Sequence, residues 1–201
     1  GFFSANTCYW QIRLEPSPLT GEPNRTMVSY KEVALQEDPL ALDGNPSNDH
    51  LITVQWREPL VNRPEHHLLG VMFETVPIDG DILITDPEHP LFDGVDLPPD
   101  HRLLGLLGYE IDRAFPGGPA GLTILAHSPF ERDGHVVHSD MTLYRAADGA
   151  PVFAAGTIQW SWGLDDYNAP SLRTARSSVA AQQLTVNVLK LLTHKAVPAL
   201  P

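Results

Sequence analysis

The most chemically suggestive part of the chain is the segment Leu103–Arg113, where an apolar run ends in a group of polar side chains. Four leucines broken by one glycine predict a strand or short helix that is buried on both faces. The run delivers Tyr109, Glu110, Asp112 and Arg113 in quick succession. A carboxylate at the edge of a dry interior must be neutral, ion-paired or bound to a cation. The segment therefore predicts either a structural ion pair of Glu110 or Asp112 with Arg113, or a metal or catalytic site.

The histidines give weaker signals. His135 and His138 have an H-x-x-H spacing that could chelate a metal from a helix, but the two valines between them favour a strand, where positions three apart face opposite sides. The adjacent pair His66–His67 is expected on the surface. The dipeptide His127–Ser128 suggests a hydrolytic triad, but the G-x-S-x-G pattern of a nucleophile elbow is absent. None of these patterns defines a site alone.

Cys8 is the only cysteine, which excludes an internal disulfide. A nucleophilic cysteine is commonly activated by the N-terminus of a helix, and no helical pattern follows Cys8. We expect a small buried thiol without a catalytic role.

The elements that must position these side chains are mostly strands. Alternating or β-branched stretches predict strands over residues 9–15, 26–31, 50–57, 68–73, 81–85, 103–113, 120–127, 135–144 and 152–162. The first two are expected to pair as a hairpin. Residues 37–49 are expected to form a long loop, and proline and glycine make 77–101 a surface excursion around one short strand. Only Ser171–Leu192 has the apolar spacing of a helix, which predicts a sheet with a C-terminal helix packed on it.

Composition narrows the class of partner. The 201 residues carry 25 Asp and Glu against 13 Lys and Arg, and this net charge of −12 argues against nucleic acid or an anionic membrane as partner. No apolar stretch of about 18 residues and no signal-peptide pattern is present, which predicts no membrane span and slightly favours the cytoplasm. The length fits one domain over residues 1–201.

The chain begins with the aromatic pair Phe2 and Phe3, in what the pattern predicts to be the end of a strand. Bulky aromatics at the first residues need neighbours to cover them. We therefore expect a truncated domain whose partner is an upstream segment of the same precursor or a second copy of the chain.

Six phrases occur in the same order as in a known family. They are Asn6–Arg13, Gln55–Arg57, Arg63–Glu65, Leu68–Phe73, Gly108–Arg113 and Val152–Trp160. Over nearly its whole length the chain resembles the C-terminal region of the N,N-dimethylformamidase large (beta) subunit family. The resemblance implies an α/β, strand-rich fold, part of a glutamine-amidotransferase-like layered sheet with β insertions and a C-terminal helix, whose first βα units lie upstream of Gly1.

The resemblance also implies a metal-dependent amide hydrolase. Enzymes of the family cleave the C–N bond of small N-substituted formamides with a mononuclear iron held by two tyrosinates and a glutamate, a hard oxygen set that suits ferric iron. Carried over to this chain, Tyr9 and Glu110 correspond to two of the three ligands. The second tyrosine is absent, because residues 41–55 contain none. Asp49, His50, Tyr30 or Tyr109 remain alternatives for the third position.

Two functions from different classes follow. The first is hydrolysis of a small-molecule amide by a metal held on Tyr9, Glu110 and a third group, with a neighbouring histidine or carboxylate handling the proton. The second is a non-catalytic binding or scaffolding module that kept the fold and lost the metal. Tyr9 can also be a core aromatic with its hydroxyl at the rim, which requires no metal.

Overall fold

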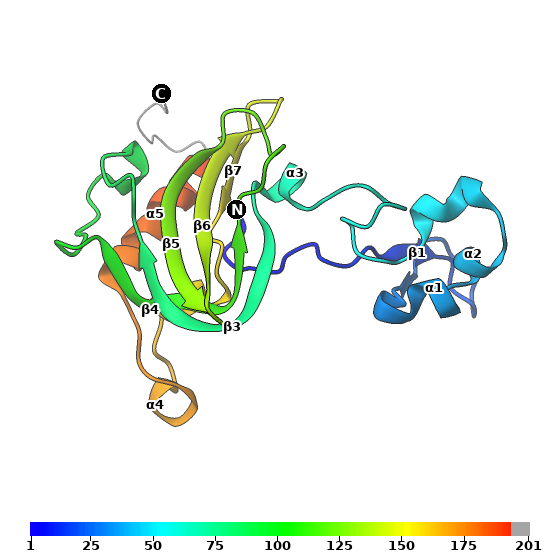
Figure 1. Cartoon of the computed structure of the whole chain (residues 1–201), viewed down its shortest axis with the longest axis horizontal. Coiled ribbons are helices and arrows are strands. Elements are labelled where there is room, and N and C mark those ends of the chain that lie inside the picture. The colour runs from blue at the N-terminus through cyan, green and yellow to red at the C-terminus, as the bar shows by residue number, and fades with distance from the viewer. Residues whose placement is uncertain (194–201) are drawn as a thin grey trace. The chain divides into compact units, whose positions relative to one another are not determined.

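The computed structural model describes residues 1–193, with the side chains of Val76, Pro77 and Pro170 excepted. Residues 1–7 and the residues from His66 onward form one compact unit, which we call the sheet unit. Cys8–Glu65 form a second compact unit, which we call the hairpin unit. Figure 1 shows the elements of both. The expectation of one family domain over 1–201 stays a prediction beside this division.

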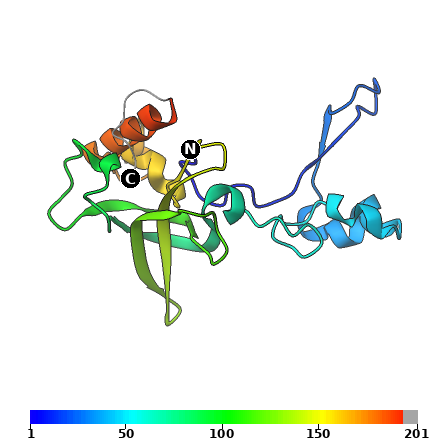
Figure 2. The same ribbon diagram turned by 90° about the horizontal axis from the view of Figure 1, so that it is seen from above.

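The sheet unit is built from antiparallel strands in two small sheets. The first sheet pairs β3 with β4, and the second has the order β5-β6-β7. The bounds are β3 Met72–Leu83, β4 Arg102–Arg113, β5 Thr123–Arg132, β6 His135–Arg145 and β7 Pro151–Ala154. Ile84, which follows β3, forms a single bridge with Ala126 of β5, and Ile111 of β4 forms another with Thr157, which follows β7. The turned view in Figure 2 shows the strands curving together beneath the C-terminal helix.

One apolar core joins both sheets to helix α5, Val179–Leu192. Ala181, Leu184 and Val188 are fully buried, and their spacing of three and four residues places them on one face of the helix. Ser178 caps the helix by accepting a hydrogen bond from the Ala181 amide. The expected strand-rich sheet with a packed C-terminal helix is therefore confirmed.

Short helical segments complete the sheet unit. They are α3 His66–Leu69, η3 Pro90–Phe92, η4 Ile158–Gly163 and α4 Ala169–Leu172. The predicted helix over 171–192 is thus interrupted, because residues 171–172 belong to α4, residues 173–178 are not helical, and α5 begins at Val179 after the Ser178 cap.

The hairpin unit contains one small sheet and several helical turns. Strand β1, Arg13–Glu15, pairs with β2, Thr26–Val28, and Leu14 lies opposite Met27. The predicted hairpin is confirmed, with shorter strands. The helical segments are η1 Lys31–Val33, α1 Ala34–Glu37, α2 Pro39–Leu42 and η2 Pro46–Leu51. The prediction of a loop over 37–49 is wrong for the helical turns within it.

The strand predicted over 50–57 is also wrong. Its residues make one isolated bridge, Gln55 to Trp10, and no named strand. Their β-branched side chains still serve the unit, because Ile52 and Val54 pack in a small core with Ala34 and Val61. β-Branched side chains favour a buried position in a small apolar core as well as a position in a paired strand, so their presence alone does not predict a strand.

Two further strand predictions differ at one end. Residues 68–69 belong to helix α3, and β3 starts only at Met72. Residues 152–162 do not form one strand, because β7 stops at Ala154 and Gly156 adopts φ +69°. A Cβ at Gly156 would lie 2.2 Å from the Asp140 carbonyl oxygen, so the chain approaches β6 too closely there for a side chain.

The central strand β4 is not buried on both faces as predicted. Leu103, Leu106 and Leu107 are buried, but Leu104 is 67% exposed. Pairing with β3 shifts register between Gly80 and Ile82, which lie opposite Leu107 and Leu103. The irregular pairing turns Leu104 away from the core while Leu106 stays buried, so the leucine run does not have one continuous environment.

The N-terminal aromatics are packed within the sheet unit. Phe2 forms a parallel bridge with Ala154, and the ring of Phe3 lies 5.4 Å from that of Phe153. Neighbours from the chain itself therefore cover much of these two rings. The expected contact with an upstream segment or a second copy stays a prediction.

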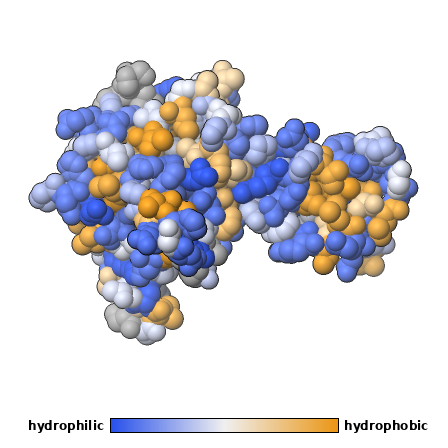
Figure 3. Space-filling view, viewed as in Figure 1, coloured by the Kyte–Doolittle hydropathy of each residue, from blue (hydrophilic) through white to orange (hydrophobic). Residues whose placement is uncertain are grey.

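Apolar surface is visible on the hairpin unit in the space-filling view (Figure 3). The exposed large apolar side chains of this unit include Ile12, Leu14, Leu19, Met27, Leu35, Leu42 and Leu51. In the described residues, every helix is too short or too polar to cross a membrane.

Candidate metal centre

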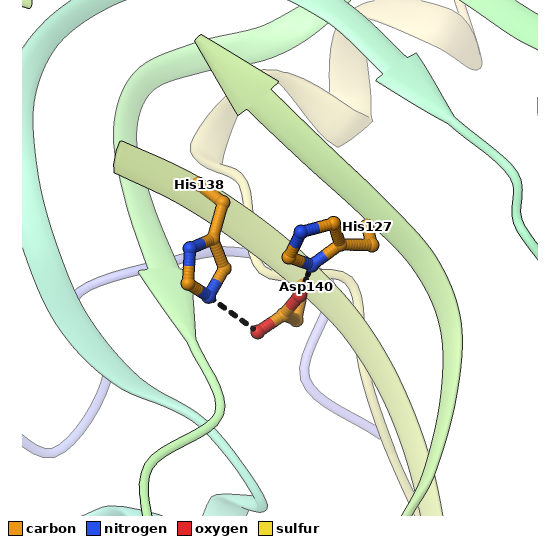
Figure 4. Close-up of side chains that lie close together, drawn as sticks. All are labelled: His127, His138 and Asp140. Atoms are coloured by element: carbon orange, nitrogen blue, oxygen red, sulfur yellow. Dashed lines mark hydrogen bonds and ion pairs between the residues drawn. The ribbon is translucent and has the colours of Figure 1, made fainter. Parts of the chain in front are cut away.

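Three ligand-type side chains converge on strands β5 and β6. In the described part of the chain, His127, His138 and Asp140 are the one group of three His, Cys, Asp or Glu residues whose ligand atoms gather within 4.8 Å of one another. Figure 4 shows the two imidazoles on either side of the Asp140 carboxylate. The arrangement presents two nitrogens and one carboxylate to the same space, which is a common ligand set for transition metals.

Strand geometry explains why these three residues meet. His127 and Asp140 are direct partners in the antiparallel ladder, so their side chains stand on the same face. His138 lies two residues before Asp140 on β6 and therefore shares that face. His135 lies three positions before His138, on a strand as predicted, and stands apart from the group.

Asp140 is the buried member of the group. Its side chain is 1% exposed, whereas those of His127 and His138 are 44% and 31% exposed. The carboxylate accepts a hydrogen bond of 2.9 Å from the Ala114 amide and lies 2.7 Å from Nδ1 of His127. Nε2 of His138 lies 3.4 Å from Oδ2. A buried carboxylate with titratable partners can orient an imidazole for proton transfer or hold a metal.

Sequence reasoning missed this group, although a signal was present. The dipeptide Asp133–Gly134 is a strong hairpin turn signal, and both residues have positive φ, as a type I′ turn requires. Counting outward from this turn pairs Arg132 with His135 and, five steps further, His127 with Asp140. The pair could therefore have been found by fixing the register, instead of testing histidine spacings along one strand.

Glu110 lies on β4 with intermediate burial, and no ion pair is found for it among the described residues. Arg113 instead pairs with Glu74, with Nε 2.6 Å from the carboxylate, and Asp112 accepts a hydrogen bond from the Asn6 amide. The predicted pairing of Glu110 with Arg113 is therefore wrong, because Arg113 finds its partner across the ladder on β3.

Tyr9 lies in the hairpin unit, just before the Trp10 bridge. Its ring stands edge-on to Trp10, with centroids 5.1 Å apart, and the guanidinium of Arg57 lies 5.2 Å from its centroid. Arg57 is itself held by the buried carboxylate of Glu65 at 2.9 Å. Tyr9 thus sits in an aromatic and cationic setting within its unit, and Glu110 belongs to the other unit.

Two other expectations are corrected. Cys8 is exposed, not buried, and partial desolvation followed by the nearby Glu65 carboxylate raises the pKa of its thiol. A raised pKa favours the protonated thiol, and the expected lack of a catalytic role stays a prediction. His66 is buried at 6% exposure, whereas its neighbour His67 is exposed as predicted. Packing against Phe115, at 6.0 Å between ring centroids, accounts for the burial of His66.

The residues implied for iron fit only in part. A phenol and a carboxylate are the hard oxygen donors that suit ferric iron. Tyr9 and Glu110 supply two such donors, and residues 41–55 supply no second tyrosine. The histidine and aspartate group has a different donor chemistry and does not complete this set.

These features define a strand-rich domain with a compact histidine and carboxylate centre. The family model described as "N,N-dimethylformamidase beta subunit-like, C-terminal" matches residues 1–172, and the chain belongs to this family. The resemblance of the six sequence phrases is thereby confirmed. No curated protein sequence matches the chain.

Proposed function

We propose that this chain contributes to metal-dependent hydrolysis of the C–N bond of a small amide. The observation that carries the proposal is the family match over residues 1–172, which includes both Tyr9 and Glu110. The substrate class follows from the family description, which names an amidase of a small formamide. The strongly acidic chain suits such a neutral substrate better than a polyanion.

Tyr9 and Glu110 are the residues proposed to hold the metal. An iron ion, when bound, acts as a Lewis acid toward the amide and toward water. Tyr9 contributes a phenol whose ring is held by Trp10 and by the guanidinium of Arg57. Glu110 contributes a carboxylate that no ion pair in the described structure occupies.

The test is metal analysis and hydrolysis of N,N-dimethylformamide by the purified full-length protein. We expect stoichiometric iron and a visible tyrosinate-to-iron absorption band in the unaltered protein. Tyr9→Phe removes the band, and Glu110→Gln lowers iron retention and activity by at least about 100-fold, since even changes outside the ligand shell cost 10 to 100-fold. Tyr167→Phe and Glu88→Gln, both at exposed positions, are the matched controls and should keep metal and activity.

Absence of iron and of hydrolysis in the full-length protein would refute this proposal. The domain would then serve as the binding or scaffolding module that is the alternative. Iron retained at full occupancy in Glu110→Gln would remove Glu110 from the site while leaving the hydrolytic proposal open to a different ligand.

We also propose that the sheet unit joins a larger glutamine-amidotransferase-like layered sheet. The parallel bridge between Phe2 and Ala154 supports this, because parallel pairing is what such a sheet uses and the named strands pair antiparallel. An upstream segment of the precursor or a second copy is the proposed partner, and the exposed apolar side chains of the hairpin unit support a role in association.

A further inference from the structure

We propose that His127, His138 and Asp140 form a binding site for a divalent first-row metal ion, separate from the proposed iron ligands. The site uses two imidazole nitrogens and one carboxylate. The inference does not depend on amide hydrolysis, since it rests on the geometry of β5 and β6 alone.

The first argument is distance. Metal bonds of about 2.0 to 2.2 Å to nitrogen and oxygen place neighbouring ligand atoms about 3.3 Å apart around a tetrahedral ion. His138 Nε2 and Asp140 Oδ2 are already 3.4 Å apart, which is longer than an ordinary hydrogen bond and matches a shared metal. His127 Nδ1 lies 2.7 Å from the other carboxylate oxygen, Oδ1, and one ligand atom from each of the three residues lies within 4.8 Å of the others, so small side-chain movements bring the three to this spacing.

The second argument is charge. Asp140 is almost wholly buried, and a buried carboxylate needs cationic or hydrogen-bonding partners. Its partners on the open side are two imidazoles, with ring centroids 4.5 Å apart. A divalent ion held between the two imidazole nitrogens supplies the buried carboxylate with the opposite charge that it lacks on this side.

The third argument is support and access. The Ala114 amide donates to Asp140 Oδ2, and such an outer hydrogen bond fixes the orientation of a ligating carboxylate. Asp140 is anchored by its place in the middle of the β5-β6 ladder. The two histidines are partly exposed, so an ion can enter and keep water in its remaining positions.

The donor types select the class of metal. Imidazole suits zinc, copper, iron and nickel, whereas calcium and magnesium prefer sets made of oxygen. A site with two imidazoles and one carboxylate is therefore expected to bind Zn²⁺ or Co²⁺ and to discriminate against Mg²⁺.

The experiment is titration of the chelator-treated full-length protein with Co²⁺, followed by its visible absorption and by displacement with Zn²⁺. We expect one Co²⁺ per chain, displaced by Zn²⁺ and not by millimolar Mg²⁺. His127→Ala and His138→Ala should each weaken binding by at least about 100-fold. His135→Ala is the matched control, because His135 lies exposed on the same strand and outside the group, and it should bind as the unaltered protein does.

The two histidine variants keep the test decisive if Asp140→Asn does not fold, because both rings are partly exposed. Failure of the unaltered protein to bind, equal binding by all three histidine variants, or equal displacement by Mg²⁺ would each overturn the proposal. Iron bound through Tyr9 and Glu110 would persist in His127→Ala, so the outcome of this test and that of the hydrolytic proposal can be separated.

Discussion

Two buried aspartates, one in each unit, show how the same residue type serves structure in one place and offers a ligand in another. Asp38 in the hairpin unit and Asp140 in the sheet unit are 0% and 1% exposed. Asp38 receives both terminal nitrogens of Arg13 at 3.0 Å, together with the Thr53 amide and hydroxyl. Asp140 receives one backbone amide and faces two histidines.

The difference lies in the partner, not in the burial. Arginine is permanently charged and its fork matches a carboxylate, so Asp38 is locked in a structural pair. Histidine can be neutral or charged near neutral pH, and its ring nitrogen can exchange a hydrogen bond for a bond to a metal ion. A buried carboxylate beside an arginine therefore indicates architecture, whereas one beside two partly exposed histidines indicates a site.

The largest effect is expected at the structural pair. Asp38→Asn removes the buried carboxylate that pairs with Arg13 and leaves the guanidinium with the more exposed Glu15, and breaking one partner of a buried pair typically costs about 3 to 5 kcal/mol. Denaturant unfolding combined with hydrogen exchange of the Thr53 amide, which donates to Asp38, measures the loss in the hairpin unit. Glu37→Gln, at an exposed neighbouring position, is the control and should leave both unchanged. A loss of stability as small as that of the control would contradict the structural role that the comparison with Asp140 gives to Asp38.

The same pair gives a pH dependence with a defined sign. Burial alone raises the pKa of Asp38, but hydrogen bonds from Arg13, Thr53 and Leu40 outweigh it and hold the pKa below the ordinary 3.8. A lowered folded-state pKa means that the stabilisation is fully present above about pH 4 and is lost as the pH falls through the folded-state value.

A smaller effect is expected at Asp140 in the absence of metal. Asp140→Asn keeps an oxygen that can accept from the Ala114 amide and loses the charge that faces His127 and His138. We expect a cost of about 1 to 3 kcal/mol by denaturant unfolding of chelator-treated protein, less than for Asp38→Asn. A cost equal to that of Asp38→Asn would show that Asp140 is a structural group of the same kind.

The smallest effect is expected at Asp166, a partly exposed carboxylate. Hydrogen bonds from Ser177 and from the Arg176 amide lower the pKa of Asp166 to about 2. The hydrogen bonds that Asp166 accepts from the residues before α5 should therefore persist above pH 4 and be lost between about pH 4 and 2. The amide proton shifts of Arg176 and Ser177 should titrate in this range in the unaltered protein, and Asp166→Asn should abolish that titration while leaving global unfolding almost unchanged.

Local patterns predicted several elements correctly for a physical reason. The strands 103–113 and 135–144, the hairpin of residues 9–31 and a helix ending at Leu192 each carry a period or a turn signal within a short stretch. The prediction failed over 50–57, where β-branched residues fill a small core without pairing, and at Leu104, where a bulge removes one leucine from the interior. Both failures depend on neighbours distant in sequence.

The order of six phrases in the sequence was enough to identify the family. Tertiary structure alone decided that Arg113 turns to Glu74, and it brought His127 and His138 together at Asp140, for which the sequence offered only the turn signal at Asp133–Gly134. The contacts of Arg113 with Glu74 and of His127 with Asp140 join different strands, and such side chains approach one another only when the ladder register is set. Residue type could nominate ligands for a metal, but register determined which of them share a single space.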